Sequence, residues 1–181
     1  FHKSAFRIND SRLLRRQLYR QLLKNLSLAE RRIVITTPYF VPEPRLLRRL
    51  KKAASRGVDV SILLPAESDV FFMPWVSALF YHELLTADVK IYEYTAGILH
   101  AKSLLIDNWG MIGSTNFNSR SIFHDLEIDY VISRQESLDS LQSQFEIDIK
   151  QANQIEINDF QKRNPILKFL GRLALFLRYW L

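Results

Sequence analysis

Two short runs of β-branched and aliphatic residues, separated by one amphipathic stretch, constrain the fold of this chain more than any other feature. The runs RRIVITTPYF (31–40) and VDVSILLP (58–65) have the composition of buried strands, and proline interrupts the first and ends the second. Between them, PEPRLLRRLKKAASRG (42–57) predicts a helix, with Pro44 suited to its first turn and Gly57 to its C-terminal cap. Helices that alternate with buried strands in this way are typical of an α/β fold.

The rest of the chain continues this alternation and then adds several strands in close succession. Leucines at every fourth position between Ser11 and Leu28 predict an amphipathic helix with a basic outer face. We therefore predict an α/β fold, a layered sandwich in which helices flank a mixed β-sheet. Further helices are predicted over 73–86 and 137–152, and further strands over 89–94, 100–107, 110–114 and 127–133.

The composition restricts the partners and the chemistry. The 181 residues carry a net charge of +6 with a sequence pI near 9.6, which favours anionic partners: nucleic acid, a lipid headgroup surface or a phosphorylated substrate. The chain has no cysteine, which excludes disulfides, thiolate zinc sites and a thiol nucleophile. No stretch approaches the ~20 uncharged apolar residues of a membrane span. Because the chain begins at Phe1, we expect that a leader was removed or that the chain is a segment of a longer protein.

Two polar side chains stand out at the beginning of the run HAKSLLID (100–107). Side chains alternate between the two faces of a strand, so His100 and Lys102 should project together, while Asp107 has the opposite parity at the far end. A direct pair of Asp107 with His100 is therefore not expected. We predict instead that the Asp107 carboxylate has a structural role and caps the following turn.

The spacing His-x-Lys-x4-Asp, followed by Gly-Ser-x-Asn, resembles the HKD motif of the phospholipase D superfamily. Here the motif consists of His100, Lys102, Asp107, Gly113, Ser114 and Asn116. Longer segments within residues 4–155 are similar to the C-terminal half of bacterial cardiolipin synthases. The resemblance implies the phospholipase D-like α/β fold and one half of the usual two-lobed enzyme.

The resemblance also implies a set of site residues and a metal-free mechanism without a cofactor. Family members form a phosphohistidine and use a second histidine as general acid, and the likeness to a C-terminal half assigns the acid role to His100. Lys102 would donate to the non-bridging phosphate oxygens and Asn116 would add an amide donor. The implied catalytic residues are His100, Lys102, Asp107 and Glu127, and the implied phosphate-binding residues are His100, Lys102, Ser114 and Asn116.

Several of these assignments have a structural alternative. Glu127 matches a family carboxylate that orients a histidine, which is either His100 or the histidine of the other half. Ser114 could donate to phosphate or form the turn, and Tyr39 could line the pocket or belong to the core. The remaining histidines, which lack such neighbours, are expected to be surface or structural residues: His2, His82 and His124.

The implied reaction is phosphatidyl transfer between phospholipids at a bacterial cell membrane. The superfamily site takes two HKD motifs and the chain has one, so the partner is either a missing N-terminal half or a second copy in a homodimer. One alternative is a phosphodiesterase or nuclease that acts on nucleic acid as a homodimer, which a charge of +6 also suits. Another is a non-catalytic structural half.

A change in composition after Asn158 divides the chain into a catalytic domain, residues 1–158, and a basic amphipathic C-terminal tail, residues 159–181. From Lys162 to Leu181 there are five basic residues and no acidic one. This pattern predicts a helix that lies on an anionic membrane surface, with Tyr179 and Trp180 near the headgroups. The alternative is a helix that docks on its own domain or on the other half.

Overall fold

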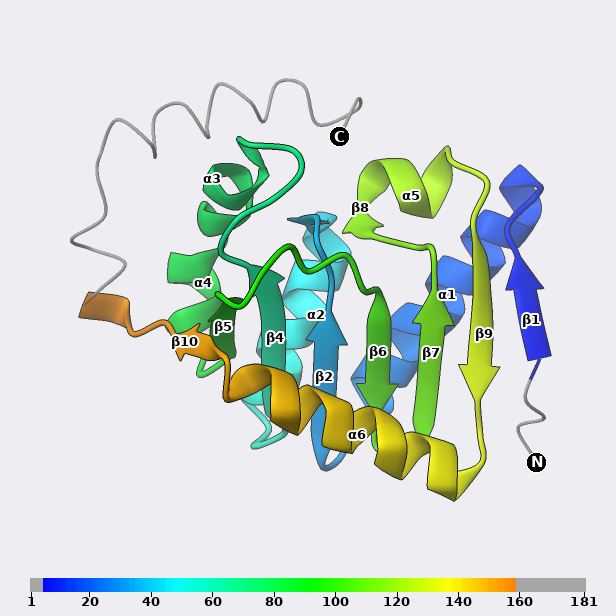
Figure 1. Ribbon diagram of the computed structural model, residues 1–181. Coiled ribbons are helices and arrows are strands. Elements are labelled where there is room, and N and C mark those ends of the chain that lie inside the picture. The colour runs from blue at the N-terminus through cyan, green and yellow to red at the C-terminus, as the bar shows by residue number, and fades with distance from the viewer. Residues whose placement is uncertain (1–4, 159–181) are drawn as a thin grey trace.

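The computed structural model describes residues 5–158. These residues form one large mixed β-sheet with a layer of helices on each face (Figure 1). The predicted tail and His2 lie outside the described residues. The sheet has eight strands in the order β1-β9-β7-β6-β2-β4-β5-β10. Their bounds are β1 (Ala5–Ile8), β2 (Arg32–Thr36), β4 (Asp59–Pro65), β5 (Lys90–Tyr94), β6 (Ser103–Ile106), β7 (Trp109–Gly113), β9 (Ile128–Ile132) and β10 (Ala152–Gln154). The predicted α/β sandwich is confirmed.

The strand directions bring several loops to one edge of the sheet. β2, β4 and β5 are parallel, whereas β6, β7 and β9 follow one another in antiparallel pairs, and β2 pairs with β6 from Ile33–Ile106 to Thr36–Ser103. The ends of β2, β4 and β7 therefore lie beside the starts of β6 and β9, at the upper edge in Figure 1. A small parallel pair, β3 (Phe40–Val41) with β8 (Phe117–Asn118), joins two of these loops at the same edge.

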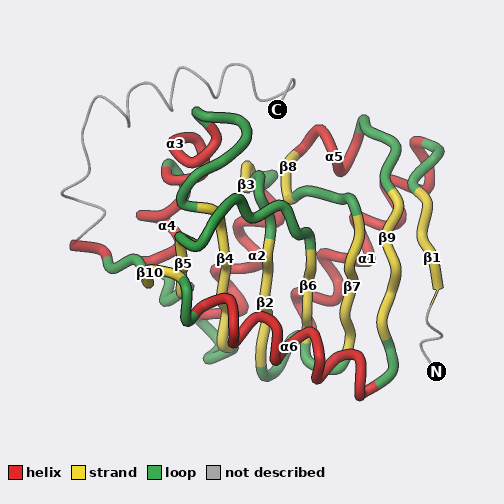
Figure 2. The backbone as a smooth tube through the Cα atoms, viewed as in Figure 1, coloured by secondary structure: helices red, strands yellow, loops and turns green. Residues whose placement is uncertain are grey.

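Each face of the sheet is covered by a different helical layer (Figures 1 and 2). Helices α1 (Arg12–Leu28) and α2 (Pro44–Ala54) pack on one face, where Leu26, Leu46 and Leu50 are fully buried. Helix α6 (Gln135–Ile149) crosses the other face obliquely and buries Leu138 and Phe145 against it. Apolar residues buried on both faces explain why β2 and β4 read as continuous apolar runs.

The predicted helix over 73–86 is wrong in one respect, because it is broken into two short helices. α3 (Met73–Ala78) and α4 (Tyr81–Leu85) are separated at Leu79 and Phe80, whose amides bond to carbonyls three residues back and so tighten the turn. Other elements are too short to give a periodic pattern: β1, β3, β8, β10 and α5 (Ser119–Phe123). Among residues 5–158, no helix combines the length and apolarity that crossing a membrane requires.

Candidate active site

His100 lies in the loop that enters β6, with its side chain 56% exposed at the loop-rich edge of the sheet. Its Nδ1 atom is 3.9 Å from Oδ2 of Asp69, in the loop after β4, and the ring of Tyr39, in the loop after β2, stands edge-on to the imidazole. The Tyr39 hydroxyl donates to the Asp69 carboxylate, 2.8 Å from each oxygen. Three loops thus build the surroundings of one imidazole.

The Tyr39–Asp69 pair fixes the protonation of both groups around neutral pH. Burial and the bond to Asp69 raise the pKa of Tyr39 to about 12, so the phenol stays a hydrogen-bond donor. For Asp69, burial would raise the pKa, but bonds from Tyr39 and Ser68 and the nearby imidazole of His100 outweigh it and lower the value. An ionised carboxylate therefore faces Nδ1 of His100 at 3.9 Å.

Lys102 lies beside His100, but not on a regular strand as the sequence predicts. β6 begins at Ser103 because its partner β2 ends at Thr36, just before Pro38, so residues 100–102 have no neighbour on that side. In this loop the Lys102 ammonium donates to the carbonyl of His100 at 2.7 Å. Burial lowers the pKa of Lys102, and the carboxylates of Glu127 and Asp69 partly oppose that shift.

The Gly-Ser-Thr-Asn turn is tied to the strands on both sides of it. The amide of Gly113 donates to the carbonyl of Lys102 at 3.1 Å, which fixes the turn beside that lysine. The Ser114 hydroxyl accepts from the amide of Ile128 at 3.0 Å, a contact that fits the turn-forming alternative. The Asn116 amide group donates to the Ser121 hydroxyl at 3.4 Å, whereas its carbonyl oxygen is buried and has no hydrogen-bond partner among the described residues.

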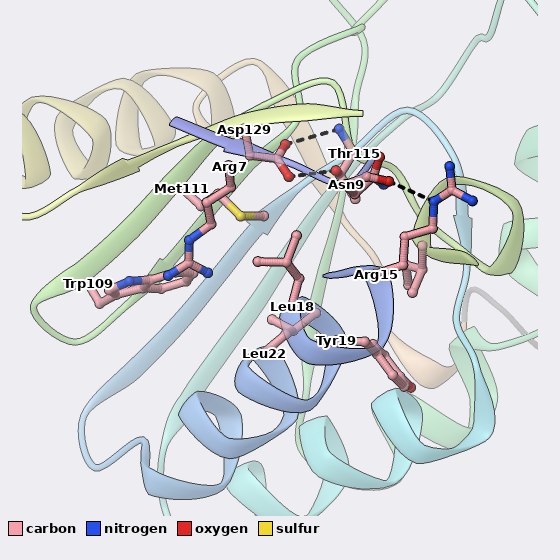
Figure 3. A pocket seen from close by; sticks show the side chains of 11 residues that line it. Arg7, Asn9, Arg15, Leu18, Tyr19, Leu22, Trp109, Met111, Thr115 and Asp129 are labelled. Carbon is pink, nitrogen blue, oxygen red and sulfur yellow. Dashed lines mark hydrogen bonds between the residues drawn. The ribbon is translucent and has the colours of Figure 1, made fainter. Parts of the chain in front are cut away.

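Asp129, on β9, holds the Gly-Ser-Thr-Asn turn through hydrogen bonds to Thr115 (Figure 3). No local motif in the sequence indicates this role. Its buried carboxylate accepts from the hydroxyl of Thr115 at 2.6 Å and from the amide of Thr115 at 3.2 Å. Burial raises the pKa of Asp129, while the bonds from Thr115 and the charge of Arg7 oppose the shift. Beneath the pair, between α1 and the sheet, a cavity of about 50 Å³ has room for a few water molecules but not for a substrate.

Glu127 is buried immediately before the first residue of β9. Its backbone forms two hydrogen bonds with Asn9, which hold the segment against the end of β1. Its carboxylate acts on Lys102 through its charge, whereas the carboxylate placed beside His100 is that of Asp69. Sequence reasoning missed Asp69, which lies 31 residues before His100 and is brought to it only by the pairing of the strands.

Asp107 lies beyond the far end of β6, whose four residues span about 13 Å, whereas His100 lies before its first residue. Its carboxylate accepts hydrogen bonds of 2.9 Å from the backbone amides of Glu30, Arg31 and Arg32, in the loop before β2. Its backbone has φ +48°, a conformation that aspartate and asparagine tolerate better than most residues. The structure thus places Asp107 away from the other motif side chains, and its carboxylate caps the entry to β2 and not its own turn.

Asp107→Asn should lower the free energy of unfolding by about 1–3 kcal/mol at pH 7, because an amide NH2 then faces at least one backbone donor. Burial would raise the pKa of Asp107, but the three backbone bonds outweigh it and lower the value, so the native state favours the ionised form. The contribution of ionised Asp107 to the free energy of unfolding is therefore fully present above its pKa in the unfolded chain, about 3.9. It is lost as the pH falls through the lower pKa that Asp107 has in the folded protein. Urea unfolding should therefore show a difference that narrows below about pH 4; a difference independent of pH would contradict this assignment.

The convergent groups suit an anionic phosphodiester. The imidazole of His100 and the ammonium of Lys102 lie in one loop at this edge, and the turn that carries the Asn116 amide is fixed beside Lys102; these are an acid or base and two donors for phosphoryl oxygens. Among residues 5–158 no group of three or more His, Asp or Glu side chains is arranged to hold a metal ion. The arrangement can therefore transfer a proton to or from an ester oxygen while it holds the phosphoryl charge.

Comparisons with known proteins agree with this fold. Residues 22–149 match the family described as cardiolipin synthase, PLD-like domain. Cardiolipin synthase A of Proteus mirabilis is 37% identical over 163 residues, which are 88% of this chain and 33% of that protein. Cardiolipin synthase A of Yersinia pseudotuberculosis is 43% identical over 116 residues, which are 64% of this chain and 24% of that protein.

Solved structures with low sequence identity share the fold. Nuc of Salmonella typhimurium, a phospholipase D family member, has a TM-score of 0.70 at 18% identity and matches 85% of this chain and 98% of its own. Phosphatidylserine synthase of Haemophilus influenzae has a TM-score of 0.69 at 16% identity and matches 91% of this chain and 45% of its own. The chain belongs to the phospholipase D superfamily, in the family of cardiolipin synthase PLD-like domains. It spans about a third of the length of the Proteus relative.

Proposed function

We propose that this chain is one catalytic half of a phosphatidyltransferase that joins phospholipids at a bacterial membrane, as a cardiolipin synthase does. The observation that carries the proposal is the convergence of His100 with Lys102, beside the Tyr39–Asp69 pair, at an exposed edge of the sheet. The match to cardiolipin synthases over most of the chain supports a phospholipid substrate.

In the proposed reaction, a histidine of the second half attacks phosphorus and forms a phosphohistidine. The bond from phosphorus to the departing alcohol breaks, and His100 gives its proton to that alcohol oxygen. The acceptor alcohol then attacks the phosphohistidine, gives its proton to His100, and the phosphorus–nitrogen bond breaks. His100 is thus acid in the first step and base in the second, and both histidines return to their starting states.

The other residues of the site hold the phosphoryl group and the imidazole. Lys102 and the Asn116 amide donate to the non-bridging oxygens, whose charge increases as the nucleophile approaches. Asp69, itself held by Tyr39, faces Nδ1 of His100 and orients the imidazole ring. Ser114 holds the turn, and Glu127 balances the charge of Lys102 from the other side.

The second half is proposed to dock on an apolar strip of the sheet beside the site. The face that α6 crosses is left open over β1, β9 and β7, where four large apolar side chains are 41–71% exposed. The strand register places these four on one face: Phe6, Ile8, Ile112 and Ile128. Because the amide of Ile128 bonds to Ser114, a domain seated on this strip would reach the motif. This chain matches 45% of the phosphatidylserine synthase of Haemophilus influenzae, a share that leaves room for a second unit of similar size and so supports a two-unit assembly.

The chain alone should turn over a phosphodiester only in its assembled form, because one motif supplies one histidine to a two-histidine mechanism. Sedimentation and assay on the same dilution series should show activity that follows the assembled fraction. Phe6→Asp, on the apolar strip, should move the midpoint of both curves to at least about tenfold higher concentration. The matched control is Leu28→Asp, which is also exposed but lies at the end of α1. Full activity per chain in a clean monomer would refute the requirement for a second half.

A nuclease that acts as a homodimer is the second candidate. The likeness to Nuc over 98% of its length favours it, because that match shows a fold unit of the same size as this chain. The identities of 37% and 43% to cardiolipin synthases favour the lipid substrate more strongly than a likeness at 18% identity favours nucleic acid. Assay of the assembled chain on a phospholipid and on duplex DNA separates the two.

A further inference from the structure

The positive charge of this chain is concentrated in one helical layer. α1 and α2 together carry ten arginine and lysine residues and no acidic residue. Since the whole chain has a net charge of +6, the remainder without these ten cations has a net charge of −4. The part of the chain that the structure describes is therefore strongly polarised, and its positive side is the layer that lies opposite α6.

Most of these cations are exposed and are not neutralised by the fold. We define the basic face by six of them: Arg16, Arg20, Lys24, Arg48, Arg49 and Lys52. Within residues 5–158, none of the six is within ion-pair distance of a carboxylate, whereas Lys51, on the flank of α2, pairs with Glu83. Holding so many like charges together weakens a fold unless an anionic partner balances them.

Two grooves in this layer are lined mainly by cationic side chains. One, of about 400 Å³, runs between α1 and α2 and is lined by Arg45, Arg48, Arg49 and Lys52 together with Leu23. The other, of about 530 Å³, lies between the start of α1 and α5 and is lined by Arg12, Arg15 and Arg16 with Phe123 and His124. Arg15 is held in place there, because it donates to the backbone carbonyls of Asn9 and Phe123.

We propose that the basic face docks the protein on an anionic phospholipid surface and that the two grooves take lipid phosphate groups. An exposed apolar side chain next to the basic face favours a lipid surface over nucleic acid. Leu13 is 64% exposed one turn before Arg16, and a leucine among arginines enters the headgroup region while the guanidinium groups meet phosphates. A duplex backbone offers no apolar layer for this side chain.

The second groove connects the basic face to the site. α5 ends at Phe123, and its Ser121 hydroxyl receives the Asn116 amide, so the groove at the start of α1 is one short helix away from the motif. A lipid phosphate in this groove would therefore lie beside the helix that contacts the motif turn. This inference rests on the proposed function for the substrate class, and it adds the surface by which the protein meets that substrate.

The test compares binding of charge variants of the full chain to vesicles by flotation. In vesicles of phosphatidylcholine with phosphatidylglycerol, Arg48→Gln with Arg49→Gln should weaken binding about thirtyfold, because the two cations near an anionic surface together contribute about 2 kcal/mol. The matched control, Arg134→Gln with Lys150→Gln, removes two exposed cations outside the basic face and should change binding less than about twofold. Arg48→Lys with Arg49→Lys keeps the charge and should bind like the parent chain.

Three results would overturn the proposal. One is equal weakening by the control, another is binding to pure phosphatidylcholine as strong as to the anionic mixture, and the third is no loss in the Gln variant. If the Gln variant loses binding to duplex DNA while it still binds vesicles, the basic face serves nucleic acid and the proposal is wrong. Because vesicle binding needs no turnover, His100→Asn should bind vesicles normally, so failure of the transfer reaction and failure of the basic face are separate results.

Discussion

Gly113→Ala should lower the free energy of unfolding by about 3 kcal/mol and displace the motif turn. Gly113 pairs directly with Asp129 across β7 and β9, and a Cβ atom there would lie 2.6 Å from the Asp129 Cα atom. It would also overlap the Asp129 carboxylate and the backbone carbonyl of Ile128. Backbone cannot move aside as a flexible side chain can, so the added methyl group must push β7 away from β9 and with it Ser114.

The matched control is Gly110→Ala in the same strand. There the nearest atom to a new Cβ is Cδ2 of Leu138 at 2.8 Å, the far end of a flexible side chain, and the next contacts are at 3.5 Å. We expect Gly110→Ala to cost less than about 1.5 kcal/mol. Urea unfolding followed by circular dichroism measures both variants. Equal losses would mean that the close approach of β7 to β9 is not what requires a glycine in the motif.

His100→Asn should reduce phosphatidyl transfer by the assembled enzyme at least about a thousandfold, because general acid–base catalysis contributes ~10²–10⁴ and both proposed steps use this imidazole. The side chain is 56% exposed, so its loss leaves no cavity. The free energy of unfolding should therefore stay within about 0.5 kcal/mol of the parent value. Turnover at saturating lipid, measured with a melting curve on the same sample, checks both expectations.

His82→Asn is the control for this variant. His82 is an exposed residue of α4, which is not one of the motif loops, so this change should leave transfer close to the parent rate. If both variants lose activity to the same extent, the loss does not report on catalysis. If His100→Asn keeps more than a few per cent of the activity, the proposed role of His100 is wrong.

The sequence predicts the parts of the fold that repeat a pattern over a long enough stretch. β2, α2 and β4 follow directly from two apolar runs around an amphipathic segment, and a proline or a glycine marks their ends. The break between α3 and α4 leaves no such signal, because the two sides keep nearly helical backbone angles and only the hydrogen bonding changes at Leu79 and Phe80.

The sequence likewise predicts the part of the candidate site that is formed by residues close together in the chain, but not the part that depends on the order and register of distant strands. Residues 100–116 form one strand-turn-strand unit, so their spacing alone brings Lys102 next to Gly113. Asp69 and Tyr39 reach His100 only because β4, β2 and β6 are neighbours in the sheet, and nothing near either residue in the chain indicates that order. Asp129 is similar, since its bond to Thr115 depends on the register between β7 and β9.

The central claim is that His100 is the general acid of a phosphodiester transfer whose nucleophile lies in the second half. The most direct test is the release of p-nitrophenolate from a p-nitrophenyl phosphodiester by an assembly in which this chain carries His100→Asn and the second half keeps its histidine. This leaving group needs no proton, so the first step should survive, whereas the second step still needs the missing base. We expect a burst of one equivalent of p-nitrophenolate per site, followed by arrest and a trapped phosphohistidine on the second half. Continuous turnover at the parent rate, or no burst at all, would contradict the claim.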